Sequence, residues 1–176
     1  IIGALDVNPI KRAMQNVVDR HEILRTEFMM LEGEPVQRIW KHVEVDFVYL
    51  EEDRKEEELI DEFVRPFAFQ SPSLLRVEVI KRKTDYLVLT DMHHIIGDGM
   101  SVNNFMREWM AYYNDVLPQY EVRQYKDYSE WMRKKNLSKA HSYWMNEFSD
   151  EIRALNIPLD FKRPSNQSYK GGCVIL

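Results

Sequence analysis

Cysteine is almost absent from this sequence of 176 residues, which contains only Cys173. A single cysteine can form no disulfide within the chain and cannot build a cysteine cluster around a metal ion. Because disulfides belong to oxidising compartments, their exclusion favours a reducing one, and we expect a cytoplasmic protein. The sequence also lacks any run of about 18 apolar residues, the length that a membrane-spanning helix needs, so we expect no membrane association.

An excess of positive charge is missing as well. The chain has 24 Lys and Arg against 29 Asp and Glu, which gives a formal net charge of −5. Affinity for the phosphates of DNA or RNA needs a basic surface, so we expect no nucleic-acid partner. The hydrophobic share of 44% is ordinary for a globular protein. The length is that of one domain, or of one lobe of a larger domain.

Both ends of the sequence look as if they lie inside a longer chain. Residues 1–6 have neither a basic leader nor the hydrophobic region of a signal peptide. Residues 171–176 end within an apolar run. We therefore expect the chain to be a piece of a longer polypeptide.

Predicted strands and helices alternate along the chain, which is typical of the α/β class. A helix is predicted after Asp6, with a buried face made of Ile10, Ala13, Met14, Val17 and Val18. A second helix is predicted over 53–63, with Leu59, Ile60 and Phe63 inward. The strongest helical pattern places six residues on one face: Val102, Phe105, Met106, Trp109, Met110 and Tyr113. Further helices are predicted over 125–133 and 138–148. Strands are predicted over 23–31, 36–40, 45–50, 74–80 and 86–92, and at the C-terminal end.

The run His93-His94-Ile95-Ile96-Gly97-Asp98-Gly99 directly follows the strand predicted over 86–92. Neighbouring strand side chains point to opposite faces, so only one of the two histidines can face a given cavity. Gly97 and Gly99 permit unusual backbone geometry and leave room for a ligand near the main chain. The helix that begins after Gly99 could favour developing negative charge with its N-terminal amides.

Three interpretations of this loop remain open from the residues alone. The histidines and Asp98 could be a core pair with a loop carboxylate, or they could form a metal site of two histidines and one carboxylate. Adjacent histidines on one strand make poor joint ligands, which counts against the metal. The third interpretation is a histidine that acts as a base or positioning group in acyl transfer, because imidazole exchanges protons near neutral pH.

Several further motifs lie before and after this loop, in an order that a known family shares. They are Arg20-His21-Glu22-Ile23-Leu24-Arg25-Thr26-Glu27-Phe28, Arg65-Pro66-Phe67 with Leu74-Leu75-Arg76, the loop itself within 92–101, Tyr125-Lys126-Asp127-Tyr128-Ser129-Glu130-Trp131, Tyr143-Trp144, and Ile157-Pro158-Leu159-Asp160 with Arg163-Pro164. Together they resemble the condensation domain of non-ribosomal peptide synthetases over nearly the whole chain.

The resemblance implies a chloramphenicol-acetyltransferase-like fold, an α/β (α+β) sandwich in which a mixed sheet is flanked by helices. Residues 1–176 would be most of the N-terminal lobe, without the start of that lobe and without the C-terminal lobe. The implied reaction is amide-bond formation between aminoacyl or peptidyl thioesters on donor and acceptor peptidyl carrier proteins. The substrates ride on phosphopantetheine arms, the domain binds no cofactor or metal of its own, and an adenylation domain is a neighbour. The lobe alone is expected to be inactive.

The resemblance also assigns roles to five residues. His94 corresponds to the catalytic histidine, either as a general base or as a group that orients the reactants. His93 and Asp98 are expected to be structural, with Asp98 paired to Arg25, and Gly99 is expected to allow close approach of the reacting carbonyl. Tyr125, Tyr128 and Trp131 are expected to pack, and His21, His42 and His141 are expected to be structural or on the surface.

Alternative functions share parts of the pattern. An epimerisation domain has the same two histidines, and an acyl-CoA-dependent acyltransferase of the same superfamily has a similar loop. A lobe that only docks carrier proteins is a third alternative, of a non-enzymatic kind. The complete motif at residues 20–28 favours an amide-forming condensation domain.

Overall fold

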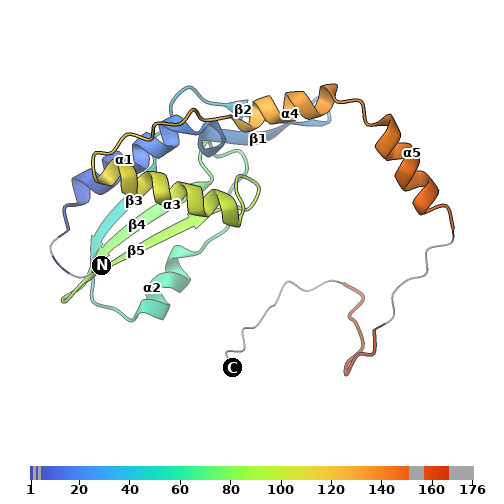
Figure 1. Cartoon of the computed structure of the whole chain (residues 1–176). Coiled ribbons are helices and arrows are strands. Elements are labelled where there is room, and N and C mark those ends of the chain that lie inside the picture. The colour runs from blue at the N-terminus through green and yellow to red at the C-terminus, as the bar shows by residue number, and fades with distance from the viewer. Residues whose placement is uncertain (2, 4, 151–156, 167–176) are drawn as a thin grey trace. The chain divides into compact units, whose positions relative to one another are not determined.

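The computed structural model describes residues 1, 3, 5–150 and 157–166. The chain divides into two compact units, residues 1–134 and 135–176, and each is described by itself. The first unit contains both sheets and four of the helices of Figure 1. The strand predicted at the C-terminal end lies outside the described residues.

The first helix, α1 (Val7–Arg20), forms where the sequence predicts it. The Asp6 carboxylate caps its start by accepting a hydrogen bond from the Asn8 N–H at 3.0 Å. The predicted buried face is confirmed in full: Ile10, Ala13, Met14, Val17 and Val18 are all buried. This face anchors the main hydrophobic core of the first unit.

A 3-10 turn, η1 (Glu22–Arg25), follows α1 and corrects the sequence prediction of a strand that begins at residue 23. The Leu24 N–H bonds to the His21 carbonyl at 3.1 Å and closes this turn. The strand β1 (Thr26–Leu31) starts only after it and pairs antiparallel with β2 (Glu34–Ile39).

A second, three-stranded sheet carries the His-His loop. It consists of β3 (Asp46–Glu51), β4 (Leu75–Lys81) and β5 (Tyr86–Met92). β3 and β4 are parallel, whereas β4 and β5 are antiparallel, so the sheet is mixed as expected. The predicted pairing of the strands over 74–80 and 86–92 is confirmed.

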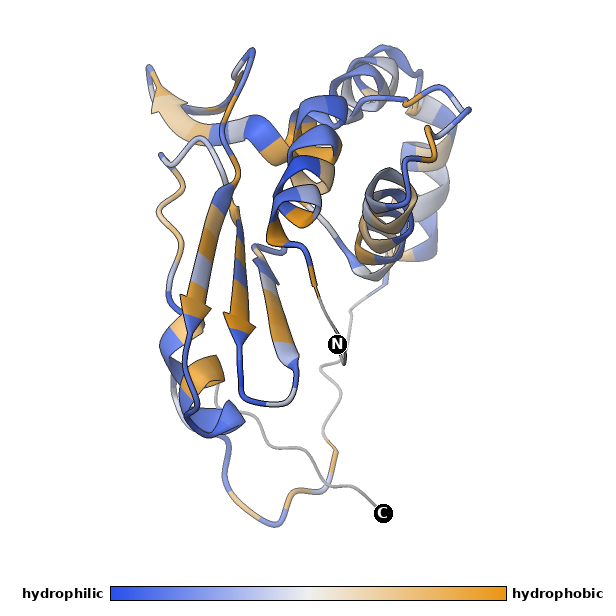
Figure 2. Cartoon of the chain, turned by 90° about the vertical axis from the view of Figure 1, so that its left-hand side faces the viewer, coloured by the Kyte–Doolittle hydropathy of each residue, from blue (hydrophilic) through white to orange (hydrophobic). Residues whose placement is uncertain are grey.

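Helix α3 (Gly99–Tyr113) packs beside α1 on one face of this sheet (Figures 1 and 2). Its Phe105 and Trp109 join the core cluster that α1 and β4 form. The predicted apolar face is only half buried, because Val102, Met106 and Met110 are exposed. The buried residue that the pattern omits is Glu108.

The remaining helices contribute little to the core. Helix α2 (Glu56–Phe63) buries Leu59 and Phe63 as predicted, but Ile60 is exposed. Helices α4 (Tyr125–Lys134) and α5 (Ser138–Glu147) bury no residue. Within the described ranges, no helix has the length and apolar character needed to cross a membrane.

Candidate active site

The His-His loop is a tight turn that leaves the end of β5. The His93 N–H continues the sheet by donating to the Leu74 carbonyl at 3.0 Å, and the Ile96 N–H donates to the His93 carbonyl at 3.1 Å. His94 is therefore the second residue of a four-residue turn, where side chains project from the chain. Its side chain is exposed, in contrast to the half-buried ring of His93.

Three contacts restrain the ring of His93. Its Nδ1 accepts a hydrogen bond from the Ile95 N–H at 3.0 Å. The rings of Phe69 and Phe67 meet it edge-on, with centroid distances of 4.9 and 6.0 Å. The different surroundings of His93 and His94 agree with the expectation that adjacent residues at a strand end face opposite ways.

Two residues fix the middle of the loop. Ile96 is buried within the main core cluster. Gly97, the next residue, is closely packed. A Cβ added to it would lie 2.8 Å from the Met92 Sδ and 3.2 Å from the Ser101 Cβ. In contrast, a Cβ on Gly99 would meet no atom within 4 Å. A Cβ at Gly97 would therefore force the side chains of Met92 and Ser101 to shift, whereas a Cβ at Gly99 would displace nothing.

Replacing Gly97 by alanine is expected to destabilise the chain by about 1–3 kcal/mol, because the new methyl group overpacks the junction of loop and helix. Gly99→Ala is the matched control. It adds the same methyl group in open space at the start of α3, so we expect an unchanged or slightly raised melting temperature. Thermal unfolding followed by circular dichroism measures both, and equal melting temperatures for the two variants would contradict the packing argument.

Asp98 caps helix α3. One carboxylate oxygen, Oδ1, accepts hydrogen bonds from the Ser101 N–H at 2.9 Å and from the Ser101 Oγ at 2.8 Å. These bonds, the one from the backbone first, hold the pKa of Asp98 below its ordinary value. The capping carboxylate fixes where the loop ends and the helix begins.

Asp98→Ala is expected to lower the melting temperature by a few degrees, because it removes the cap. Asp98→Asn should stay close to the wild type, since asparagine caps helices as well as aspartate does. Because the folded-state pKa is lowered, the contribution of the charge is present above the unfolded pKa of about 3.9 and is lost as the pH falls through the folded pKa. Melting curves between pH 7 and pH 3 should therefore show the gap between the wild type and the Ala variant narrowing toward the acid end without closing, because a neutral side chain with an acceptor oxygen still caps, as asparagine does.

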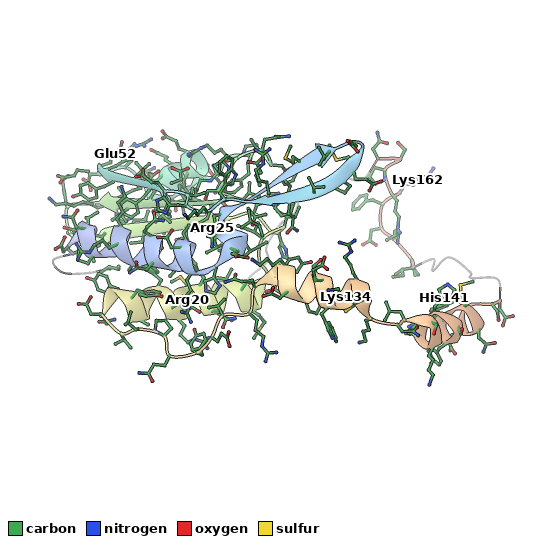
Figure 3. All side chains as sticks on the ribbon, turned by 90° about the horizontal axis from the view of Figure 1, so that it is seen from above. Arg20, Arg25, Glu52, Lys134, His141 and Lys162 are labelled. Carbon is green, nitrogen blue, oxygen red and sulfur yellow. The ribbon has the colours of Figure 1, made fainter. Side chains whose placement is uncertain are left out.

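Arg25 and Asp98 are not brought together. Arg25, labelled in Figure 3, is the last residue of η1, and its guanidinium donates to the Trp40 carbonyl, while the Trp40 N–H donates to the Arg25 carbonyl at 2.9 Å. Among the described residues, no ion pair joins Arg25 to Asp98, whose Oδ1 accepts both hydrogen bonds from Ser101. Arg25 instead closes the base of the β1–β2 hairpin.

A hollow of about 660 Å³ lies next to the loop and is lined by Ile96 and Ser101 on one side. Tyr125, Tyr128 and Trp131 of α4 form part of its wall, and each of these three side chains is more than half exposed. The sequence predicts packing rather than substrate contact for these aromatic residues. Their rings contact one another along α4, Tyr125 with Tyr128 and Tyr128 with Trp131.

A buried carboxylate that the sequence pattern does not indicate is bonded to His21, one of the residues that line this hollow. Glu108 of α3 is 2% exposed and accepts hydrogen bonds from the Tyr120 hydroxyl and from His21 Nε2, each at 2.7 Å. Arg20 Nε lies 3.3 Å from the same carboxylate. Burial raises the pKa of Glu108, but the bonds from Tyr120 and His21 outweigh it and hold the pKa below its ordinary value. The cluster joins the end of α1 to α3 and gives His21 a structural role.

The loop therefore holds one exposed imidazole, that of His94, on a turn in which His93 and Asp98 are hydrogen-bonded and Ile96 is buried. Such a group can accept or donate a proton, or hold a reacting amine in place. Within the described residues, no group of three His, Cys, Asp or Glu side chains is arranged to hold a metal ion.

Known proteins resemble this chain in sequence and in structure. Bacitracin synthase 3 from Bacillus licheniformis is 42% identical over 182 residues, which cover 99% of this chain and 3% of that protein. The X-domain from teicoplanin biosynthesis has a TM-score of 0.76 at 24% identity, with 93% of this chain and 40% of that chain covered. The condensation domain of the monacolin K polyketide synthase has a TM-score of 0.69 at 19% identity, with 82% and 35% covered.

These likenesses confirm the expected fold, a mixed sheet flanked by helices of the chloramphenicol-acetyltransferase type. The chain spans only a small part of the curated relative and less than half of the two solved structures. A sequence model described as the condensation domain matches residues 1–175. The chain therefore belongs to the condensation-domain family, as the motifs of its sequence indicated.

Proposed function

We propose that this chain is the N-terminal lobe of a domain that joins two carrier-bound thioesters through an amide bond, and that His94 serves the reaction. The proposal rests on one observation, which is that the loop holds the His94 side chain exposed on a well-anchored turn. Its imidazole is exposed on a turn that Ile96 anchors in the core, His93 braces and Asp98 caps. The share of 35–40% that the chain covers in similar structures supports a lobe of a larger domain.

In the proposed reaction the amine of the acceptor attacks the carbonyl carbon of the donor thioester. A new C–N bond forms, the carbon–sulfur bond breaks, and the thiol of the donor carrier leaves with a proton. The amine must lose one proton during this sequence, and His94 either takes it or holds the amine in line with the carbonyl. His93, Asp98 and Arg25 act indirectly, because they support the loop and the neighbouring hairpin.

The substrates would be delivered by donor and acceptor peptidyl carrier proteins, on their phosphopantetheine arms. That thioester supplies the activated acyl group, so the lobe needs no resident cofactor for this chemistry. An adenylation domain elsewhere in the synthetase would load the carriers. A C-terminal lobe would complete the walls around His94, and the 176-residue chain alone is expected to form no product.

The test is a reconstitution of the synthetase that contains this chain, with donor and acceptor both loaded on carriers. Mass spectrometry should detect an amide-linked product on the acceptor carrier. Transfer from free acyl-CoA without carriers would instead identify an acyltransferase, and inversion of one carrier-bound residue without coupling would identify an epimerisation domain. Carrier binding without any turnover would leave only the docking function, and each of these three outcomes overturns the proposal.

A further inference from the structure

The segment between α2 and β4 contains a motif, Arg65-Pro66-Phe67, to which the proposed reaction gives no role. Two aromatic rings from this segment, Phe67 and Phe69, lie against His93. Both contacts are edge-on, with interplanar angles of 82° and 75°. Edge-on packing at such distances is a favoured arrangement of ring pairs, and two such contacts restrict the rotation of the imidazole.

Phe67 itself packs against a buried arginine. The Arg76 guanidinium stacks on Phe67 at 3.7 Å from the ring centroid, and it is paired to Asp91 at 3.2 Å. Arg76 is 4% exposed and also donates to the Arg65 carbonyl. A buried cation on an aromatic face is a strong restraint on that ring.

Phe69 is tied to the other sheet. Its carbonyl accepts a hydrogen bond from the Phe28 N–H of β1 at 2.9 Å, and the rings of Phe28 and Phe69 meet edge-on at 6.5 Å. The segment thus connects β1 with the end of β5 and contacts His93 between them. A shift of Phe69 would be transmitted to the imidazole of His93.

The imidazole of His93 can brace the turn in only one tautomer. A backbone N–H is always a donor, so Nδ1 of His93 must be the acceptor for Ile95, and the neutral ring carries its hydrogen on Nε2. A ring that rotated, or that carried a hydrogen on Nδ1, would lose this bond. The turn that presents His94 would then lose one of its restraints.

We propose that Phe67, Phe69 and Arg76 are positioning residues that clamp His93 in this orientation and tautomer, and thereby fix the turn on which His94 stands. The catalytic consequence rests on the proposed function of His94, whereas the clamp itself does not. The three residues act through His93, which Phe67 and Phe69 contact and to which Arg76 is linked through Phe67. Their effect should appear in the turnover number rather than in substrate binding.

The first test is the tautomer of His93, read by long-range hydrogen–nitrogen NMR on the chain labelled with ¹⁵N-histidine. In the wild type, Nδ1 of His93 should give the signal of an unprotonated nitrogen. In Phe69→Leu this signal should move toward that of His141, which is exposed. Phe69→Tyr, whose hydroxyl can reach water because Phe69 is 42% exposed, should restore the wild-type signal. Phe161→Leu, at a residue 86% exposed, is the matched control.

The second test is steady-state kinetics of the same variants in the intact synthetase. Phe69→Leu should lower kcat about ten- to a hundredfold with KM unchanged, as expected for a displaced catalytic group, and Phe69→Tyr should recover it. An unchanged His93 signal in Phe69→Leu overturns the clamp. A changed signal with an unchanged kcat overturns its catalytic consequence. If the wild-type synthetase forms no amide while the signal still changes, the proposed function fails and the clamp stands.

Discussion

Under the proposed function, replacing His94 by alanine in the intact synthetase is expected to slow amide formation by about 10²- to 10⁴-fold, the usual contribution of a general acid or base. The fold should survive, because the side chain is exposed and Ile96, His93 and Asp98 hold the turn. The rate is measured by single-turnover formation of the condensed product on the acceptor carrier. Circular dichroism of the variant chain checks that it still melts as the wild type does.

Two alanine variants separate the role of His94 from a general sensitivity of the protein to losing a histidine. His141→Ala, on the exposed surface of α5, should keep the full rate. His93→Ala should lower both the rate and the melting temperature, because it removes the acceptor of the Ile95 N–H and the contact with Phe69. A folded His94→Ala enzyme with a normal rate would remove His94 from the mechanism.

His94→Asn distinguishes a base from a positioning group. Asparagine can still accept or donate a hydrogen bond, but it does not take up a proton near neutral pH. If His94 is the base, the asparagine variant should be as slow as the alanine variant, and one limb of the pH–rate profile should disappear. If His94 only orients the amine, the asparagine variant should keep a substantial part of the rate.

Periodicity in the sequence was sufficient to predict the elements that the core fixes. The face of α1 was predicted residue by residue, because all of its apolar positions are covered. The burial of the apolar face of α3 was overestimated, because, among the described residues, no other element covers part of that face. Helical spacing says which side chains share a face, but not whether another element covers that face, and Met106 and Met110 remain exposed.

The strand predicted from residue 23 begins only at Thr26, because residues 22–25 form the 3-10 turn η1. β-branched and aromatic residues such as Ile23 and Phe28 favour extended chain, but a hydrogen bond between Leu24 and the carbonyl of His21 competes locally and forms η1. Such a choice depends on how α1 ends. A pattern that scores only side-chain types does not contain that information.

The position of the His-His loop after β5 was predictable, but the partners of its members were not. Asp98 lies directly before a helix, and a carboxylate there is drawn to the free amides of the first turn. That local bond with Ser101 takes the place of the predicted pair with Arg25. The aromatic contacts of His93 come from Phe67 and Phe69, which lie more than 20 residues earlier, so no local pattern indicates them.

Glu108 could have been found from the sequence with one further rule. It lies three residues after Phe105 and next to Trp109, both buried, so the helix carries it toward the core. A carboxylate in that place needs a partner of opposite charge or several hydrogen-bond donors. Arg20 and His21 are the basic residues at the end of the neighbouring helix.

Glu108→Ala is accordingly expected to be among the most destabilising single changes in the first unit. Removing one member of a fully buried ion pair costs about 3–5 kcal/mol. Arg20 and His21 keep about a fifth of their side chains exposed (20% and 24%). We therefore expect about 2–4 kcal/mol, or a fall in melting temperature of roughly 5–15 °C. Thermal unfolding of the 176-residue chain measures it, with exposed Glu44→Ala as the control that should not change the melting temperature.

Glu108→Gln tests whether the charge itself is responsible. The amide keeps the size of the side chain and can still accept the bond from Tyr120, so the remaining loss is that of the negative charge facing Arg20 and His21. Because the folded-state pKa of Glu108 is lowered, this contribution is present above the unfolded pKa of about 4.3 and is lost as the pH falls through the folded pKa. The melting temperatures of the wild type and Glu108→Gln should differ near neutral pH and converge as the pH falls through the lowered folded-state pKa of Glu108. A gap that stayed constant into acid would mean that packing, rather than charge, joins α1 to α3 at this point.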